Sequence, residues 1–304
     1  MRGSVLVTGG AGYIGSHTCL ALIKAGWNPV VLDNFSNSNV EAVARLTELT
    51  GSDITILEGD IRDTLTCAKA LRDYNCKSVI HFAGLKAVGE SQSNALEYYD
   101  VNVIGSHRLI EAMRDVGVDR LIFSSSATVY GMPEKLPLDE SHSLAPVNPY
   151  GQTKLVVENM ISDIAKSSMD LRYGILRYFN PVGADVSGMI GEDPRGTPNN
   201  LMPIIAQVGV GRREALSIFG DDYQTVDGTG VRDYIHVSDL AEAHVRALSR
   251  LFQSQDSYIV NLGTGLADPG HAERLLGWKA KHGLEALCRD HWNCQSANPS
   301  GYEF

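Results

Sequence analysis

A tyrosine and a lysine with the spacing of a proton-transfer pair stand in the middle of this sequence. Tyr150 and Lys154 form the pattern Y-x-x-x-K, and because they are four residues apart at the start of an expected helix, they share one helical face. The pKa of a tyrosine is ordinarily near 10, but an adjacent ammonium group favours the phenolate and lowers that pKa. The pair therefore predicts a tyrosine that exchanges protons with a substrate hydroxyl. An exposed helical pair without a catalytic role is the alternative.

A serine-rich turn precedes this pair. Residues 124–130 read SSSATVY and directly follow an expected buried strand, at the edge where an open parallel sheet presents its ligand-facing residues. Ser126 is the hydroxyl best placed to relay a proton, whereas an ordinary serine-rich turn is the other interpretation. We predict Tyr150, Lys154 and Ser126 as the catalytic residues.

Four glycines near the N-terminus indicate a phosphate-binding loop. The stretch SVLVTGGAGYIG places Gly10, Gly12 and Gly15 in the pattern G-x-G-x-x-G, after an expected strand and before an expected helix. Without side chains there, a pyrophosphate can approach bare backbone N–H groups at a helix N-terminus. A tight strand–helix turn that binds nothing is the alternative.

Asp33 indicates which dinucleotide the loop binds. It ends the second expected strand, 18 positions beyond Gly15, where a carboxylate accepts hydrogen bonds from the ribose hydroxyls of adenosine. A carboxylate at that point repels a 2′-phosphate, so the sequence predicts NAD rather than NADP. Asp60 ends the third expected strand in the same way. For both aspartates, the alternative is an ordinary turn residue that binds no ligand.

Short runs rich in valine, isoleucine and leucine alternate with longer helical patterns, which is typical of β-α-β units around a parallel sheet. The expected strands cover residues 4–8, 29–32, 54–57, 78–82, 120–124 and 171–176. The expected helices cover residues 16–25, 40–49, 65–74, 95–116, 151–166, 201–210, 237–251 and 283–292. We therefore predict an α/β fold with a doubly wound, Rossmann-like parallel sheet in residues 1–177.

The sequence changes in character after Tyr178. Residues 179–200 are rich in Gly, Pro, Asn and Asp, and a loop of that length within a compact domain is usually functional or disordered. Residues 178–304 are expected to form a smaller, substrate-binding lobe. A cleft between the two lobes is the expected ligand site.

Composition and charge exclude several classes of function. The net charge is −10 with no block rich in Lys or Arg, so we expect no nucleic-acid partner and no membrane. The sequence has no G-x-S-x-G elbow and no metal-ligand spacing, and we predict no metal site. His81 and His236 are expected to be satisfied core or cleft groups. Five cysteines without a CxxC pair favour a reducing, cytoplasmic location.

Longer strings carry a resemblance to a known family. The glycine loop, Asp33, the serine after the fifth strand and Y-x-x-x-K together resemble the extended short-chain dehydrogenase/reductase superfamily. LVTGGAGYIGSHT, HFAGLKAVGES, FSSSATVYG, NPYGQTK, LRYFNPVGA, PNNLMPIIAQV and DGTGVRDYIHVSDLA are similar to the UDP-glucose (UDP-galactose) 4-epimerase family within it. These strings extend from residue 5 to about residue 265.

The resemblance implies interconversion of UDP-glucose and UDP-galactose with bound NAD, and with it a set of site residues. Tyr150 would remove the proton of the sugar 4-hydroxyl while hydride passes from C4 to NAD, Ser126 would relay the proton, and Lys154 would hold the nicotinamide ribose. NAD would contact Gly9, Gly12, Tyr13, Ile14, Gly15, Asp33, Asn34, Asn37, Ser38, Asp60, Ile61, Phe82, Ala83, Gly84, Lys86, Asn102, Tyr150, Lys154 and Phe179. The nucleotide-sugar would contact Ser126, Asn180, Asn200, Leu201, Phe219 and Arg232. Without the resemblance, a salt bridge from Arg232 to Asp233 or Asp239 is the preferred interpretation.

The resemblance is interrupted after residues 261–265, NLGTG. There the chain continues directly with LADPGHAERLLGWKA, and roughly 35 residues of the family pattern, about one β-α-β crossover, are absent. The absent arginine and aspartate would have held the uridine diphosphate, so we expect weaker substrate binding and exposed apolar faces in the second lobe.

Three functions remain open at this point. The first is the 4-epimerase, impaired by the deletion; the second is a noncatalytic NAD-binding form that associates with a full-length copy. The third is a dehydratase or reductase of the same superfamily, which is disfavoured because Ser126-Ala127-Thr128 lacks the acidic residue expected there. A homodimer is implied by similarity, with residues 95–116 and 151–166 as the contact helices, although their apolar stripes could equally be buried within one subunit.

Overall fold

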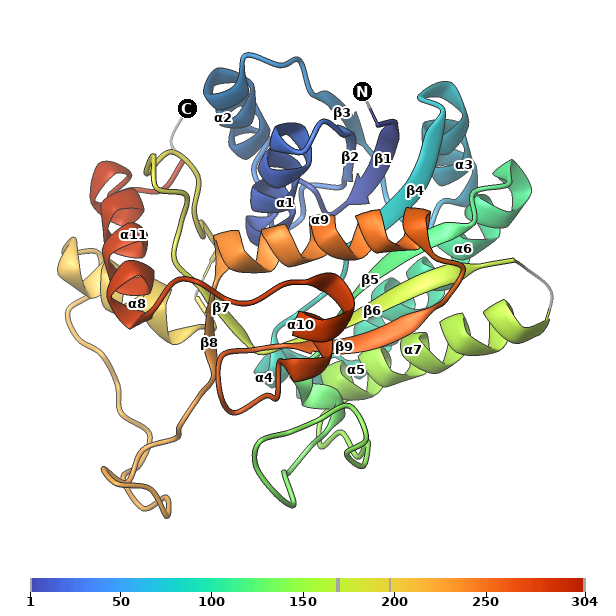
Figure 1. Cartoon of the computed structure of the whole chain (residues 1–304). Coiled ribbons are helices and arrows are strands. Elements are labelled where there is room, and N and C mark those ends of the chain that lie inside the picture. The colour runs from blue at the N-terminus through green and yellow to red at the C-terminus, as the bar shows by residue number, and fades with distance from the viewer. Residues whose placement is uncertain (1, 168–169, 197, 303–304) are drawn as a thin grey trace.

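The computed structural model describes residues 2–167, 170–196 and 198–302. Its main feature is a parallel sheet in the strand order β3-β2-β1-β4-β5-β6-β9 (Figure 1). The strands are β1 (Ser4–Thr8), β2 (Asn28–Asp33), β3 (Thr55–Glu58), β4 (Cys76–His81), β5 (Arg120–Ser126), β6 (Arg172–Tyr178) and β9 (Tyr258–Leu262). The predicted doubly wound, Rossmann-like fold is confirmed. Its topological switch point, where such folds bind dinucleotides, lies between β1 and β4.

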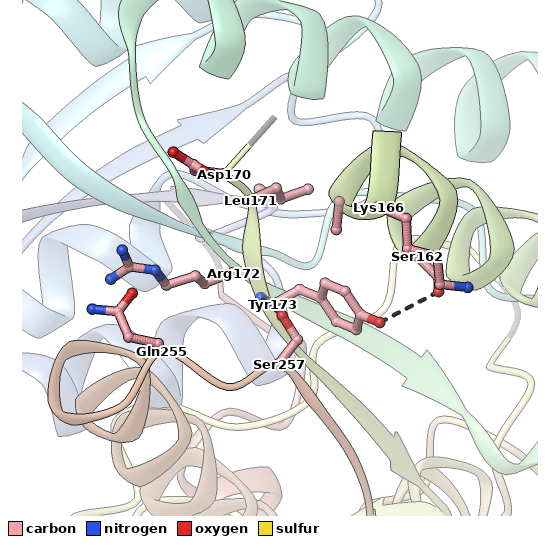
Figure 2. Close-up of a pocket in the computed structure, with 9 residues that line it drawn as sticks. Ser162, Lys166, Asp170, Leu171, Arg172, Tyr173, Gln255 and Ser257 are labelled. Carbon is pink, nitrogen blue, oxygen red and sulfur yellow. Dashed lines mark hydrogen bonds between the residues drawn. The ribbon is translucent and has the colours of Figure 1, made fainter. Parts of the chain in front are cut away.

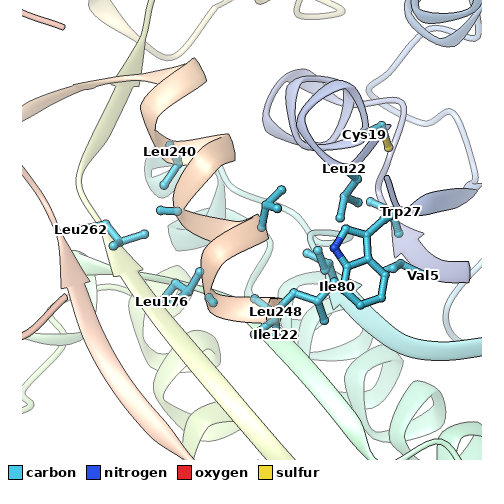
Figure 3. Close-up of a cluster of buried hydrophobic side chains, with 14 of the residues drawn as sticks. Val5, Cys19, Leu22, Trp27, Ile80, Ile122, Leu176, Leu240, Leu248 and Leu262 are labelled. Atoms are coloured by element: carbon cyan, nitrogen blue, oxygen red, sulfur yellow. The ribbon is translucent and has the colours of Figure 1, made fainter. Parts of the chain in front are cut away.

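Helices cover both faces of the sheet because successive strand residues point to opposite sides. Val5 and Val7 pack against one helical layer, whereas Leu6 packs against the other. The first layer comprises α1 (Tyr13–Lys24), α2 (Glu41–Thr50) and α9 (Val237–Gln253); Figure 3 shows side chains of α1 and α9 meeting those of the strands. The second comprises α3 (Thr64–Asp73), α6 (Gly105–Val116) and α7 (Pro149–Ser167).

The helix expected over residues 95–116 is divided into three segments. It consists of α5 (Ala95–Tyr98), a π-helical segment η1 (Tyr99–Ile104) and α6. The short helix α4 (Val88–Ser93) precedes it, and η2 (Ala127–Val129) follows β5. Short π-helical segments occur frequently at functional sites, and η1 contains Asn102, one of the predicted cofactor residues.

The smaller lobe is built on a second, two-stranded parallel sheet. β7 (Asn180–Val182) pairs with β8 (Tyr234–His236), so the expected long loop of residues 179–200 contains a strand, while residue 197 lies outside the described residues. The lobe's helices are α8 (Leu201–Gly209), α10 (Gly270–Leu276) and α11 (Leu284–Ala297). The division at residues 177/178 stays a prediction. Beyond it, β9 completes the first lobe's sheet and α9 covers one face of that sheet.

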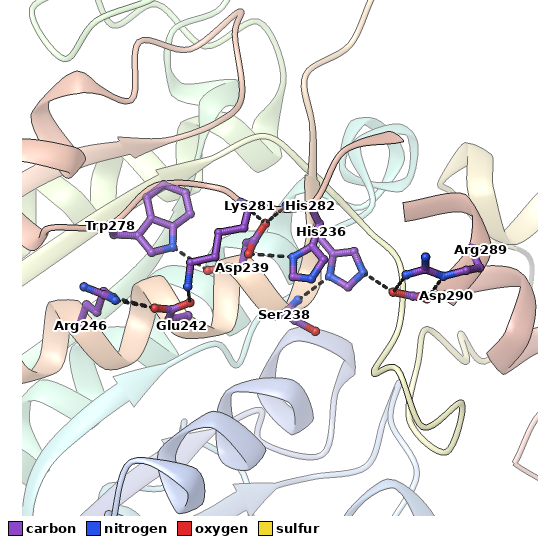
Figure 4. A network of polar contacts seen from close by, with 10 residues as sticks. All are labelled: His236, Ser238, Asp239, Glu242, Arg246, Trp278, Lys281, His282, Arg289 and Asp290. Atoms are coloured by element: carbon purple, nitrogen blue, oxygen red, sulfur yellow. Dashed lines mark hydrogen bonds and ion pairs between the residues drawn. The ribbon is translucent and has the colours of Figure 1, made fainter. Parts of the chain in front are cut away.

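Polar contacts attach the chain beyond residue 265 to α9. The carboxylate of Asp239 accepts hydrogen bonds from the backbone N–H groups of Lys281 (2.8 Å) and His282 (2.9 Å), and the indole of Trp278 donates to the Asp239 carbonyl (2.9 Å). Figure 4 shows this network together with the ion pairs of Glu242. Trp278 is buried, so this segment is packed against α9.

In the described part of the chain, no helix has the length and apolar character that a membrane-spanning segment needs.

Candidate active site

Neighbouring atoms pack so closely against three of the four glycines of the loop that none of these positions can accommodate a side chain. A Cβ at Gly9 would lie 2.7 Å from the Ala83 nitrogen, a Cβ at Gly10 would lie 2.9 Å from the Val7 oxygen, and a Cβ at Gly15 would overlap the carbonyl oxygen of Gly9. At Gly12 a Cβ would meet only that same oxygen, at 3.3 Å. Gly12 therefore makes a single close contact with the rest of the loop, and it lines a cavity at the N-terminus of α1, where a pyrophosphate can bind.

Asp33 lies at the end of β2 with its carboxylate turned toward this loop. Its Oδ2 accepts a hydrogen bond from the backbone N–H of Ala11 (3.0 Å), and its Oδ1 accepts from Phe35 N–H (3.0 Å) and Ser38 Oγ (2.8 Å). A carboxylate has about four acceptor positions, so one remains for a ribose hydroxyl. The residues present thus fit the adenosine end of NAD.

Asp60 and Asn34 meet beside Asp33. Asn34 Nδ2 donates to Asp60 Oδ2 (3.0 Å), and the guanidinium of Arg62 donates to both carboxylate oxygens. The pKa of Asp60 is lowered to about 2, mainly by the hydrogen bonds from Arg62. The predicted residues Asp60 and Asn34 therefore form one charged cluster at the sheet edge.

Asn102 holds the segment that follows β4. Its Oδ1 accepts from the N–H of Leu85 (2.8 Å), and its Nδ2 donates to the Leu85 carbonyl (3.1 Å) and to Thr153 Oγ1 (3.0 Å). A Cβ at Gly84 would lie 2.9 Å from Asn102 Oδ1. Asn102 thus links the post-β4 segment to α7, which carries Tyr150. Other predicted cofactor residues pack in apolar clusters: Ile14 and Phe82 in the first layer, Ile61 and Ala83 in the second, and Phe179 in a third, smaller cluster.

The three predicted catalytic residues come together where β5 ends and α7 begins. The phenol of Tyr150 is hydrogen-bonded to Ser126, and Thr128 donates to Ser126 Oγ from its backbone N–H (3.2 Å) and hydroxyl (3.0 Å). Lys154 Nζ lies 5.9 Å from the Tyr150 ring centre and donates to the Ser124 carbonyl (2.8 Å). The arrangement can pass a proton between two hydroxyls beside an ammonium group.

The chain alone does not lower the pKa of Tyr150, so that expectation is wrong for the protein without ligands. Burial raises the Tyr150 pKa above its usual value, and the hydrogen bond to Ser126 opposes the shift only in part. Burial also lowers the pKa of Lys154 to about 8, against the opposing charge of Glu158. Spacing along a helix shows which groups are neighbours but does not show how far both are removed from water.

A buried ion pair lies one helical turn beyond Lys154. Glu158 and Arg177 are each 3% exposed and are joined at 2.6 Å, while the hydroxyl of Ser125 donates to Glu158 and Arg177 donates to the Tyr130 hydroxyl (3.1 Å). These contacts connect α7 to β5 and β6, so they fix the helix that carries Tyr150 and Lys154. Sequence reasoning did not single out this pair, because the two residues are 19 positions apart.

A cavity beside the glycine loop joins the two lobes. It is lined on the first-lobe side by Ala11, Gly12, Tyr13, Ser16, Asn37, Ser38, Asn39, Ala42 and Lys86, and on the other side by Gly191, Glu192, Asp193, Pro194 and Tyr302. Five residues of the first set were predicted to contact the cofactor, namely Gly12, Tyr13, Asn37, Ser38 and Lys86, and none of the second set was predicted. The only signal for residues 191–194 was the unusual length of the loop that contains them.

Three of the predicted nucleotide-sugar residues lie near the cavity or on the elements beside it. Asn180 begins β7, where its N–H donates to the Asp233 carbonyl (3.0 Å). Asn200 Nδ2 donates to Glu192 Oε1 (2.9 Å), and the same oxygen lies 3.4 Å from Lys86 Nζ. Leu201 begins α8 and is partly exposed.

Phe219 and Arg232 are not brought to the other site residues. Phe219 is 98% exposed on the segment of residues 211–233, and Arg232 is exposed and donates to the Val231 carbonyl (2.9 Å). The other interpretation of Arg232, a salt bridge to Asp233 or Asp239, is wrong within the described residues. The Asp233 carboxylate instead accepts hydrogen bonds from the backbone N–H groups of residues 264–267. Figure 1 shows the 211–233 segment extending away from both sheets.

Two other features are separate from this site. A hollow near Ser162, Arg172 and Tyr173 lies where β6 and β9 begin, at the opposite edge of the sheet (Figure 2). His81 is a satisfied core group as predicted: its ring nitrogens lie 2.7 Å from Thr8 Oγ1 and 2.8 Å from Ser106 Oγ. Among the described residues, no group of three or more His, Cys, Asp or Glu side chains is arranged to hold a metal ion.

Comparison with known proteins agrees with this geometry. Residues 5–263 match the NAD dependent epimerase/dehydratase family. The chain is 49% identical to a UDP-glucose 4-epimerase of Bacillus subtilis and 48% identical to one of Homo sapiens, covering 99% of each protein and of itself. A Stenotrophomonas maltophila UDP-glucose 4-epimerase with bound NAD and formylated UDP-arabinopyranose has a TM-score of 0.95 at 45% identity, covering 98% of this chain and 99% of that one. A Bifidobacterium longum UDP-glucose 4-epimerase with NAD+ and UDP has a TM-score of 0.95 at 39% identity, covering 98% and 100%.

The comparison also measures how much this chain lacks. The alignment with the Bacillus subtilis protein spans 335 positions, whereas this chain has 304 residues, so at least 31 positions (335 − 304) have no residue here. A gap of this size agrees with the roughly 35 absent residues predicted from the interrupted motifs. Its location after residue 265 stays a prediction.

Proposed function

Because this chain belongs to the NAD dependent epimerase/dehydratase family, we infer that it is an NAD-dependent isomerase that interconverts UDP-glucose and UDP-galactose. The observation that carries the inference is the hydrogen bond between Tyr150 and Ser126 beside the Lys154 ammonium, at the sheet edge that also carries the glycine loop. This geometry, in a chain that matches 4-epimerases over almost its full length, suits reversible oxidation at a sugar carbon.

Bound NAD would supply the hydride acceptor, and then the hydride donor, for the sugar C4. Tyr150 accepts the proton of the 4-hydroxyl and gives it back, and Ser126 relays it because the two hydroxyls are already hydrogen-bonded. Lys154 is held by the Ser124 carbonyl, facing the same region. In this proposal its charge favours the Tyr150 phenolate and offsets part of the effect of burial.

The residues that hold NAD follow from the cavity and its surroundings. The N–H groups around Gly12 and Tyr13 would meet the pyrophosphate at the N-terminus of α1, and Asp33 would accept a ribose hydroxyl. Lys86 lines the same cavity and supplies a cation for the phosphates. These assignments explain why Gly12 lines the cavity, whereas Gly9, Gly10 and Gly15 do not.

The nucleotide-sugar site is incomplete on its uridine side. Asn180, Asn200 and Leu201 lie on or beside β7 and α8, but the side chains of Phe219 and Arg232 are exposed to solvent. Each charged hydrogen bond lost to the diphosphate weakens binding by about 1.5–3 kcal/mol. We therefore expect the chain to bind NAD normally and UDP-hexoses weakly.

Substitution of Tyr150 tests the proposed activity. Tyr150→Phe should abolish conversion of UDP-galactose to UDP-glucose, measured by chromatography of the nucleotide-sugars, while NAD remains bound, because only the phenolic oxygen is lost. Tyr173→Phe is the matched control, since that phenol lies at the opposite edge of the sheet. If Tyr150→Phe turned over at the wild-type rate, or if wild-type protein with bound NAD did not convert UDP-galactose, the proposal would be wrong.

Oligomeric state and location belong to the same proposal. Leu96, Tyr99 and Ile104 are exposed on α5 and η1, next to α7, which supports a homodimer formed through residues 95–116 and 151–166. All five cysteines are free thiols, which supports work in a reducing compartment such as the cytoplasm.

A further inference from the structure

Residues 191–195 line one side of the cavity beside the glycine loop and contact the first lobe; we call them the strap. Gly191, Glu192, Asp193 and Pro194 line the cavity opposite the glycine loop. Farther along, the guanidinium of Arg195 donates to the carbonyl of Phe35 (3.0 Å), two residues beyond Asp33. The strap therefore extends over the cavity toward the adenosine end of the proposed NAD site.

Tyr302 fixes the first residue of the strap. Its buried phenol accepts a hydrogen bond from the N–H of Gly191 (2.6 Å) and donates one to the Gly191 carbonyl (3.1 Å). Its own backbone N–H donates to Asp193 Oδ2 (3.0 Å). One side chain thus satisfies both backbone groups of Gly191, and the backbone beside it holds Asp193.

The same tyrosine is attached to the first lobe. The Arg45 guanidinium of α2 stacks 4.4 Å from the Tyr302 ring centre, and Asn39 Nδ2 donates to the Tyr302 carbonyl (3.3 Å). Arg45 also donates to the Met189 carbonyl (2.9 Å), just before the strap. Figure 1 shows the chain running from α11 to a position beside α2. Tyr302 therefore links the strap to α2 and to the loop that follows Asp33.

We propose that Tyr302 is a positioning residue for the cofactor site, holding the strap over the bound dinucleotide and slowing its release. The proposal rests on the proposed function in one respect, that the dinucleotide is NAD. An epimerase must keep its cofactor in place between removal and return of the hydride, because release of the reduced form would interrupt the reaction. A strap fixed by two hydrogen bonds and a stacked guanidinium supplies that retention.

Dissociation of the dinucleotide tests this role directly. Protein loaded with fluorescent NADH is mixed with excess NAD, and the fall in bound NADH fluorescence gives the release rate. Tyr302→Phe removes both hydrogen bonds to Gly191 but keeps the ring, and should release NADH about tenfold faster. Arg45→Met removes the stacked guanidinium and should act in the same direction. Tyr74→Phe, which alters a phenol at the end of α3, is the matched control and should release NADH at the wild-type rate.

The outcomes separate this proposal from the proposed function. Faster release from Tyr302→Phe, with the melting temperature of the dinucleotide-free protein unchanged, supports the positioning role. A general loss of structure would also speed release, but it would lower the melting temperature as well. Wild-type release rates in both Tyr302→Phe and Arg45→Met would overturn it while leaving NAD binding intact. A wild-type protein that binds no dinucleotide would overturn the proposed function and this proposal together.

Discussion

Alanine at Gly12 should weaken NAD binding with little effect on stability, whereas alanine at Gly15 should destabilise the fold. A methyl group at Gly12 meets only the Gly9 oxygen, at 3.3 Å, and the backbone there has φ −73° and ψ 174°, which alanine readily adopts. A methyl group at Gly15 overlaps the Gly9 oxygen and lies 2.8 Å from the Gly10 Cα. Both of these neighbours are backbone atoms, so the overlap cannot be relieved by rotation of a side chain.

The expected magnitudes follow from these contacts. Gly15→Ala overpacks a rigid strand–helix turn at a cost of about 1–3 kcal/mol, and each kcal/mol lowers the melting temperature by about 2–4 °C in a chain of this order of size. Gly12→Ala should melt near the wild-type temperature. Its methyl group occupies the space of the pyrophosphate, and loss of one charged hydrogen bond, about 1.5–3 kcal/mol, weakens NAD binding at least about tenfold.

Two measurements on each variant test the reasoning. Calorimetric titration with NAD gives the dissociation constant, and differential scanning fluorimetry without NAD gives the melting temperature. Gly89→Ala is the control, because a Cβ there meets nothing within 4 Å. If Gly12→Ala bound NAD as tightly as wild type, the pyrophosphate would not pass over Gly12, and the assignment of the cavity would be refuted.

Three further predictions concern the catalytic helix and the proposed dimer. Glu158→Ala should lower the unfolding free energy by about 3–5 kcal/mol in urea titrations, because it leaves the buried Arg177 unpaired; a loss below about 1 kcal/mol would contradict this. Burial lowers the pKa of Lys154 in the folded protein from 10.5 to about 8. Above pH 8 the unfolded chain therefore binds more protons at this group than the folded protein does. The unfolding free energy should rise by about 1.4 kcal/mol from pH 7 to pH 9. Lys154→Met should lack that rise, and identical pH profiles would disprove the shift. Leu96→Glu should yield monomers in light scattering if α5 and η1 form the dimer contact, whereas an unchanged mass would exclude that contact.

The strands and the glycine loop were predictable because their signals are local. The expected strand of residues 4–8 has the bounds of β1, and the fifth strand extends only two residues further than expected, to Ser126. Gly15 and Asp33 belong to one β-α-β unit, in which a short loop and a buried strand fix their positions. Periodicity could not reveal η1, since α- and π-helical turns bury similar side chains.

The strap and Tyr302 were not predictable because the contact joins distant parts of the chain. Tyr302 and Gly191 are 111 positions apart, and neither belongs to a pattern that indicates a ligand. The pKa of Tyr150 was misjudged for a related reason: the four-residue spacing to Lys154 is local, but the burial that raises the pKa comes from elements packed around the helix. Local sequence thus identified which groups meet but not the environment in which they meet.

Two aspartates explain why the interrupted chain still folds around its cofactor site. The Asp233 carboxylate accepts four backbone N–H groups of residues 264–267 and the Thr264 hydroxyl (2.6 Å), so the segment at the expected deletion is held next to β8. Asp239 holds residues 281–282 on α9 in the same way. Both aspartates bind backbone close to the junction and need no residue from the absent part. Phe219 has no comparable partner among the described residues, so we expect the predicted deletion to weaken the uridine side of the site and to leave the NAD side assembled.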